Sequence, residues 1–224
     1  MNVALQRPAA IVFDMDGTLL DTESLALRAW EEAAAAVGAT FEQGLARELI
    51  GKNFADSSLH VRAHFQAHGD YPVDAVLHGW RTSFESLATR EGIAVKSGAH
   101  ELLAFLAASG IPCAVATSTR REQARSKLDD AGLLAHFVAV IGGDDVRHGK
   151  PAPDIYLAAA EALGIEPAHG LAIEDSETGF RAAHAAGMPT ILIPDLVVPG
   201  ASLLALSPRI MQSLADVHQL LASP

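Results

Sequence analysis

Short apolar runs that alternate with helical patterns restrict the fold of this sequence more than any other feature. The runs lie at residues 9–13, 113–117, 137–141, 171–173 and 190–193. Between them, apolar residues recur three and four positions apart over residues 99–108, 121–131, 154–163 and 178–186. A strand that is apolar along its whole length is buried on both faces, as in a parallel sheet covered by helices. We therefore predict an α/β fold with a doubly wound parallel sheet.

Local signals mark the ends of these helices and the end of the chain. A glycine follows each helical stretch, where a left-handed C-terminal residue is expected: Gly110, Gly132, Gly164 and Gly187. Beyond the last apolar run, residues 209–211 fit one more short strand and residues 213–221 fit a closing helix.

The alternation stops between the first apolar run and Lys96. This segment has helical patterns only, at residues 23–37, 41–49, 55–68 and 73–91, with Asp21 as the N-cap of the first. We predict a helical bundle inserted into the sheet domain, so that residues 1–20 and 97–224 form the core and residues 21–96 form a cap. Parallel sheets bind ligands at the carboxyl ends of their strands, and an insertion at this point is expected to stand above them like a lid.

Composition excludes several kinds of partner. The formal net charge of -11 leaves no basic surface for nucleic acid or an anionic membrane, and the four lysines are Lys52, Lys96, Lys127 and Lys150. No apolar stretch approaches the roughly 18 to 20 residues that span a bilayer, and no signal-like segment opens the chain. We expect a cytoplasmic protein, a monomer or a homodimer. The single cysteine, Cys113, lies in an apolar run and is expected in the core.

Two carboxylates follow the first predicted strand. Asp14 ends the apolar run, and Asp16 comes two residues later, before Gly17 and Thr18. Carboxylates this close repel each other unless a cation lies between them. Taken alone, the segment fits either a polar turn or a phosphoryl-transfer site, which needs a nucleophile, a metal and an acid for the leaving oxygen.

The longer segment DMDGTLLDTE, residues 14–23, resembles the first signature of the haloacid dehalogenase superfamily, in the subclass with a helical cap. Three further segments resemble the remaining signatures, in the family's order, and each follows a predicted strand. They are VATST at 115–119, GKPAPDIY at 149–156 and IEDS at 173–176. The resemblance extends from Asp14 to Gly187 and implies a phosphotransfer enzyme that acts on a small phosphorylated metabolite.

The resemblance also implies roles for the first two segments. Asp14 is then the nucleophile that forms an aspartyl-phosphate, and Asp16 protonates the leaving oxygen and later takes a proton from water. The Thr117 hydroxyl and the Ser118 amide hold the phosphoryl group.

The third and fourth segments complete the implied site. Lys150 pairs with Asp14 and with the phosphate. Mg²⁺ is bound by the Asp14 carboxylate, the Asp16 carbonyl, Asp175, and Glu174 directly or through water. Oxygen ligands completed by water are what Mg²⁺ prefers.

Within this superfamily the sequence favours a phosphatase. Dehalogenases and phosphonoacetaldehyde hydrolases lack an acid at the position of Asp16. Hexose-phosphate mutases of the beta-phosphoglucomutase branch are the closer alternative, and they carry a cap histidine and a cap arginine where this chain has Ala26 and Phe54. The substrate expected for a phosphatase is a sugar phosphate or a phosphoglycolate-like molecule. A non-catalytic phosphate-binding or partner-binding relative remains a third alternative, although Asp14, Asp16, Lys150 and Asp175 are all present.

The predicted cap contains two further features. In the loop of residues 50–54, Lys52 and Asn53 are candidates for substrate specificity, and a solvated helix connection is the alternative. The histidines at 60, 64 and 68 share one helix face, which we interpret as solvated, because no carboxylate or cysteine in the sequence pattern completes a metal site. Trp30 and Trp80 are expected in the cap core.

Overall fold

The structure is a computed structural model that describes residues 7–50, 54–66, 70–206 and 208–223. These residues separate into two compact units. The first comprises Met1–Leu20 and Val95–Pro224, and the second comprises Asp21–Ala94. No helix in the described part of the chain is both long and apolar enough to cross a membrane.

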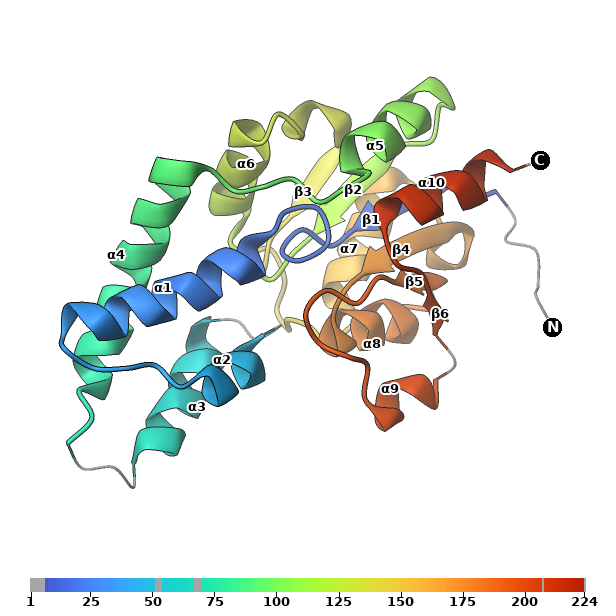
Figure 1. Ribbon diagram of the computed structural model, residues 1–224. Helices are drawn as coiled ribbons and strands as arrows, with labels where there is room; N and C mark the ends of the chain where they lie inside the picture. Colours follow the sequence, from blue (N-terminus) through green and yellow to red (C-terminus); the bar gives the residue numbers. More distant parts are fainter. Residues whose placement is uncertain (1–6, 51–53, 67–69, 207, 224) are drawn as a thin grey trace. The chain divides into compact units, whose positions relative to one another are not determined.

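The first unit is built on a parallel sheet of six strands in the order β3-β2-β1-β4-β5-β6 (Figure 1). The strands are β1 (Ala10–Phe13), β2 (Cys113–Ala116), β3 (Ala139–Ile141), β4 (Gly170–Glu174), β5 (Thr190–Leu192) and β6 (Arg209–Ile210). All residues of β1, β2 and β4 are buried, as their continuous apolar sequences predict. The predicted doubly wound parallel sheet is thus confirmed, including the short sixth strand.

Helices cover both faces of this sheet. Val12 and Ala172 pack against α7 (Asp154–Leu163) and α8 (Glu177–Ala185) in one apolar cluster. Neighbouring residues of a strand point to opposite faces, so Ile11 and Phe13 face the other layer. Figure 1 shows α5 (Ala99–Ala108) beside α10 (Leu214–Ala222) in that layer, where these two helices pack together. The remaining helices of the unit are α6 (Arg121–Asp130) and the short α9 (Ala201–Leu204).

Most predicted boundaries agree with the structure within a few residues. The four glycines expected after the helices all have positive φ, from 67° at Gly110 to 76° at Gly187. One strand differs, because β3 begins at Ala139 and not at Phe137. Residues Leu134–His136 form a 3-10 turn, and Phe137 caps it. A second such turn, Pro167–His169, precedes β4.

The second unit is a bundle of four helices: α1 (Thr22–Ala36), α2 (Gln43–Leu49), α3 (Phe54–Phe65) and α4 (Val73–Glu91). Its core contains a stack of aromatic rings, with the Trp30 centroid 5.2 Å from Phe41 and 5.3 Å from Trp80. Phe54 stacks on Trp80 at 4.8 Å. Trp30 is only 2% exposed, which confirms the prediction that it belongs to the core of this bundle. The predicted N-cap is also present, since Asp21 accepts a hydrogen bond from the Ser24 amide at 3.3 Å.

Candidate active site

The carboxyl ends of three neighbouring strands bring the sequence-predicted residues together. Asp14 directly follows β1, Thr117 directly follows β2, and Glu174 is the last residue of β4. β1 lies between the other two, with Phe13 paired to both Val115 and Ile173. Because parallel strands end at one edge of a sheet, these side chains share one site, and that edge is where such folds bind ligands.

A buried ion cluster lies at the end of β1. The Lys150 ammonium donates to Asp14 Oδ1 at 2.5 Å and to Glu174 Oε1 at 2.6 Å. The Tyr156 hydroxyl donates to the same Glu174 oxygen at 2.5 Å, and the Ser176 hydroxyl donates to Glu174 Oε2 at 3.1 Å. The Lys150 side chain is only 5% exposed and that of Glu174 is fully buried. Each buried charge therefore has an oppositely charged partner, as burial requires.

Burial and charge act in opposite directions on the pKa values of Asp14 and Lys150. Desolvation raises the pKa of Asp14 well above its ordinary value, although the Lys150 ammonium opposes the shift. Burial lowers the pKa of Lys150, but the Asp14 and Glu174 carboxylates outweigh it, so the net shift is upward and Lys150 stays protonated. Burial also raises the pKa of Tyr156, which keeps its phenol as a donor to Glu174. One lysine ammonium thus faces two buried carboxylates.

The same edge of the sheet could hold a divalent cation. Asp14, Glu174 and Asp175 each offer a carboxylate oxygen, and the three oxygens lie within 4.8 Å of one another. Thr18 donates to Asp175 Oδ1 at 3.4 Å. Carboxylate oxygens are the ligands that Mg²⁺ and Ca²⁺ favour, and a cation here would offset the excess negative charge. Within the described residues this is the one group of three or more side chains placed to bind a metal.

Two glycines leave the space that these carboxylates occupy. A Cβ at Gly17, where φ is +88°, would overlap the Asp175 carboxylate. A Cβ at Gly179, in the first turn of α8, would overlap the whole Glu174 carboxyl group. The Glu174 carboxyl group cannot keep its position beside a larger residue, since it is enclosed on all sides. A larger residue at Gly17 would also be strained by the positive φ.

Asp16 belongs to a second network, on the β2 side of β1. Its Oδ2 accepts hydrogen bonds from the Thr117 hydroxyl at 3.1 Å and the Thr119 hydroxyl at 2.7 Å. Its Oδ1 accepts from the Lys127 ammonium at 2.9 Å. Neither Thr119 nor Lys127 is among the site residues predicted from the sequence. Lys127 could have been noticed as one of only four lysines, on the helix that follows the Thr117 loop.

A loop after β3 supports the start of that helix. Asp144 Oδ1 accepts a hydrogen bond from the Arg121 amide at 2.8 Å, at the N-terminus of α6. The loop approaches so closely that a Cβ at Gly142 would overlap the Arg121 backbone, and one at Gly143 would lie 2.5 Å from the Ser118 carbonyl oxygen. The segment that carries Thr117 and Ser118 is therefore held between β2, α6 and this loop.

The residues predicted in the cap have different outcomes. Lys52 and Asn53 lie outside the described residues, as does the histidine at 68. For the other two histidines, which we interpreted as a solvated face without a completed metal site, α2 and its N-cap supply one carboxylate each. His60 Nε2 lies 2.6 Å from Glu48, and His64 Nε2 lies 3.2 Å from Glu42. Each histidine pairs with a carboxylate, and these side chains form no group of three ligands in the described part of the chain.

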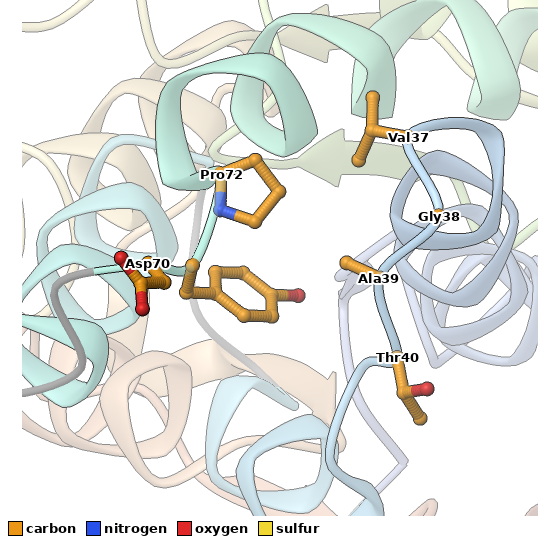
Figure 2. Close-up of a pocket in the computed structure, with 7 residues that line it drawn as sticks. Val37, Gly38, Ala39, Thr40, Asp70 and Pro72 are labelled. Atoms are coloured by element: carbon orange, nitrogen blue, oxygen red, sulfur yellow. The ribbon is translucent and has the colours of Figure 1, made fainter.

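The bundle also contains an open pocket of about 710 Å³. Figure 2 shows its lining, which comes from the turn after α1 and the segment before α4: Val37, Gly38, Ala39, Thr40, Asp70, Tyr71 and Pro72. None of the sequence-predicted site residues that the structure describes lines it, and Asp70, the charged residue of this lining, is exposed.

This chain is similar to known proteins of one family over most of its length. Residues 8–187 match the haloacid dehalogenase-like hydrolase family. Hexitol phosphatase A of Escherichia coli is 36% identical over 187 residues, which cover 84% of this chain and 83% of that protein. A hydrolase of the same superfamily from Deinococcus radiodurans, solved with bound phosphate and sodium, has a TM-score of 0.80 at 30% identity, covering 98% of this chain and 100% of that one. A CbbY variant from Rhodobacter sphaeroides, solved with xylulose 1,5-bisphosphate, has a TM-score of 0.74 at 30% identity, covering 93% and 96%.

Proposed function

The chain belongs to the haloacid dehalogenase-like hydrolase family and is a phosphatase of its type, and we propose that it hydrolyses a small phosphorylated metabolite through an aspartyl-phosphate on Asp14. The observation that carries this proposal is the buried Asp14 carboxylate, 2.5 Å from Lys150 and grouped with Glu174 and Asp175. A carboxylate at the end of a strand, beside fixed positive charge, is placed to attack phosphorus.

We propose Mg²⁺ as the cation of this site. Asp14, Glu174 and Asp175 would hold it, together with the Asp16 carbonyl. When bound, it supplies positive charge that offsets the repulsion between these carboxylates and a phosphate. The oxygen ligands and the buried excess of negative charge support this assignment.

The side chains then divide the reaction between them. An Asp14 carboxylate oxygen attacks phosphorus, the bond to the leaving oxygen breaks, and Asp16 gives that oxygen a proton. Asp16 next takes a proton from a water molecule, whose oxygen attacks phosphorus and breaks its bond to Asp14. Inorganic phosphate leaves and both carboxyl groups return to their starting state. Lys150, Thr117 and the Ser118 amide bind the phosphoryl oxygens throughout.

The likeness to known proteins supports a sugar phosphate or a related metabolite as the substrate. Hexitol phosphatase A is named for a sugar-alcohol phosphate, and the CbbY variant holds a sugar bisphosphate. Lys52 and Asn53 remain our candidates for contacts with the part of the substrate remote from phosphorus.

The packing of the bundle favours a phosphatase over a hexose-phosphate mutase. Phe54 stands where such mutases carry an arginine, and its ring stacks on Trp80 at 4.8 Å. Ala26 stands where they carry a histidine, and its carbonyl accepts the Trp80 indole proton at 3.2 Å. Both positions contribute to aromatic packing and offer no side chain that can bind a second phosphate.

The test is a phosphate-release assay over a panel of hexitol phosphates, hexose phosphates, phosphoglycolate and xylulose 1,5-bisphosphate. Release with Mg²⁺, its loss on chelation and its return with added Mg²⁺ are expected. Full activity after exhaustive chelation would contradict the metal assignment. Conversion of a hexose 1-phosphate to the 6-phosphate without phosphate release would identify a mutase, and tight phosphate binding without turnover would identify a non-catalytic relative.

A further inference from the structure

The contacts of Asp16 raise the question of what holds this carboxylate while a phosphoryl group is bound. Within the described part of the chain, donors from Thr117, Thr119 and Lys127 reach it. The Thr117 hydroxyl has one proton to donate, and its oxygen already accepts the Thr119 amide at 3.1 Å. If Thr117 turns its proton to a phosphoryl oxygen, as the proposed function requires, it can no longer donate to Asp16. Of these three donors, the Thr119 hydroxyl and the Lys127 ammonium can still hold the Asp16 carboxylate.

The Lys127 contact differs from an ordinary surface ion pair. The two side chains are only 21% and 25% exposed, so solvent screens their attraction less than it screens an exposed pair. The Lys127 ammonium donates a charge-assisted hydrogen bond to Asp16 Oδ1, and the Thr119 hydroxyl donates to Asp16 Oδ2. Contacts to both oxygens fix the rotation of the carboxylate as well as its position.

The helix that carries Lys127 is itself fixed. α6 has its first free amide capped by Asp144, and Leu128, next to the lysine, is fully buried. A donor on a rigid element can hold a catalytic group to a narrow range of positions, which a donor on a free loop cannot do. The lysine comes from α6 and the threonine from the segment after β2, so two separate elements define where Asp16 points.

We propose that Lys127, together with Thr119, is a positioning residue that holds the Asp16 carboxylate at the leaving oxygen while Thr117 binds the phosphoryl group. This inference rests on the proposed function. In this role Lys127 neither contacts the substrate nor transfers a proton. Replacing Lys127 should therefore slow only the steps in which Asp16 donates or accepts a proton.

Substrates with different leaving groups can distinguish a positioning role of Lys127 from a general structural role. An alkyl phosphate such as a hexitol phosphate releases a strongly basic alkoxide oxygen, which needs a proton from Asp16. p-Nitrophenyl phosphate releases a weakly basic phenolate, which needs little assistance. The ratio kcat/KM covers formation of the aspartyl-phosphate, the step in which the leaving oxygen departs. A displaced Asp16 should therefore reduce kcat/KM for the alkyl ester much more than for the aryl ester.

The experiment measures kcat/KM on both esters for the wild type, Lys127→Met and Thr119→Val, all loaded with Mg²⁺. Lys127→Met is expected to lower the value for the alkyl ester at least tenfold more than for p-nitrophenyl phosphate, within the roughly 10² to 10⁴ that a positioned acid supplies. Lys127→Arg, which keeps the charge, should recover part of this loss. Arg125→Met is the matched control, since it removes an exposed cation from the same helix and should change neither value.

Several results would overturn the inference. One is an equal loss of kcat/KM on both esters in Lys127→Met, and another is no loss on either ester. A gain of kcat/KM on the alkyl ester would also overturn it, because the Lys127–Asp16 pair would then restrain Asp16 from acting. Circular dichroism of each variant checks folding. If Lys127→Met does not fold, the same comparison of kcat/KM on the two esters is made with Thr119→Val. Failure of the proposed function has a different outcome, because the wild type would then release phosphate from neither ester.

Discussion

At the scale of single residues, Gly179 shows how backbone and charge are linked in this site. The Glu174 carboxyl group fills the space beside Gly179 and is held there by Lys150 and Tyr156. We predict that Gly179→Ala displaces Glu174 and weakens Mg²⁺ affinity by about 10- to 100-fold, a usual cost of disturbing the support of a metal ligand. Isothermal titration with Mg²⁺ measures this.

Gly44 provides the control for that substitution. It also lies in the first turn of a helix, and a Cβ there meets nothing within 4 Å. Gly44→Ala should leave Mg²⁺ affinity unchanged and should slightly raise stability through better helix propensity. Equal Mg²⁺ affinity in the two alanine variants would show that the space beside Glu174 does not matter.

The residues of the site were predictable in part. Asp14, Glu174 and Asp175 follow or end buried strands, and the order of strands in a parallel sheet is enough to bring them together. The contacts of Lys127 and Tyr156 were not predictable, because they depend on how α6 and α7 are each rotated and placed over the sheet. Lys127 is 111 residues from Asp16 in sequence, and no local sequence pattern predicts a contact between residues so far apart.

At the scale of elements, α6 begins with a cap that comes from elsewhere in the chain. The Arg121 amide bonds to Asp144 and lowers the pKa of that carboxyl group. A depressed pKa in the folded state means that Asp144 contributes stability above its ordinary pKa of 3.8, and that this contribution is lost as pH falls through the folded value. Asp144→Ala should therefore lower the Tm at neutral pH, and the difference should shrink in acid.

Thermal unfolding followed from pH 7 towards pH 3 measures this effect. Asp130→Ala is the control, because Asp130 ends the same helix, is exposed, and lies where a negative charge is unfavourable to the helix dipole. Its Tm should equal or exceed that of the wild type. A Tm difference for Asp144→Ala that stays constant in acid would argue that the cap does not depend on charge.

The elements themselves were largely predictable, for a physical reason. Strands such as Cys113–Ala116 are apolar throughout, and helices such as Asp154–Leu163 repeat their apolar residues every three or four positions. Contacts between elements were harder to foresee. The carboxylates opposite His60 and His64 belong to the preceding helix and its cap, and the α6 cap is 23 residues from the amide it bonds. Such pairs follow from packing, which local pattern does not specify.

At the scale of the whole molecule, a chain of net charge -11 has only four lysines, and two of them bind carboxylates of the site. Lys150 and Lys127 bind the two catalytic candidates, and Lys96 bonds to Asp195 at 2.5 Å. The Asp14, Glu174 and Asp175 carboxylates still outnumber the lysine between them, so we expect a bound cation to stabilise the fold.

A cation that binds only the folded state should raise the Tm as its concentration rises. The stabilisation should reach about 2.7 kcal/mol at a Mg²⁺ concentration 100 times the Kd. Asp175→Asn should abolish most of this rise, whereas Asp130→Asn, at an exposed position, should keep it. Scanning fluorimetry across a Mg²⁺ titration makes the measurement, and equal rises in the two variants would place the cation elsewhere.

The central claim is that Asp14 is the covalent nucleophile of a Mg²⁺-dependent phosphatase, and the turnover of Asp14→Asn tests it most directly. The amide nearly matches the shape of the carboxylate and can still accept a hydrogen bond from Lys150, so the fold should survive. Phosphate release should be measured for the wild type and the variant on the best substrate of the panel, at saturating Mg²⁺. We predict a fall in kcat of at least about 10³-fold, because removing the covalent nucleophile abolishes the main reaction path. Wild-type turnover by a folded Asp14→Asn protein would contradict the account.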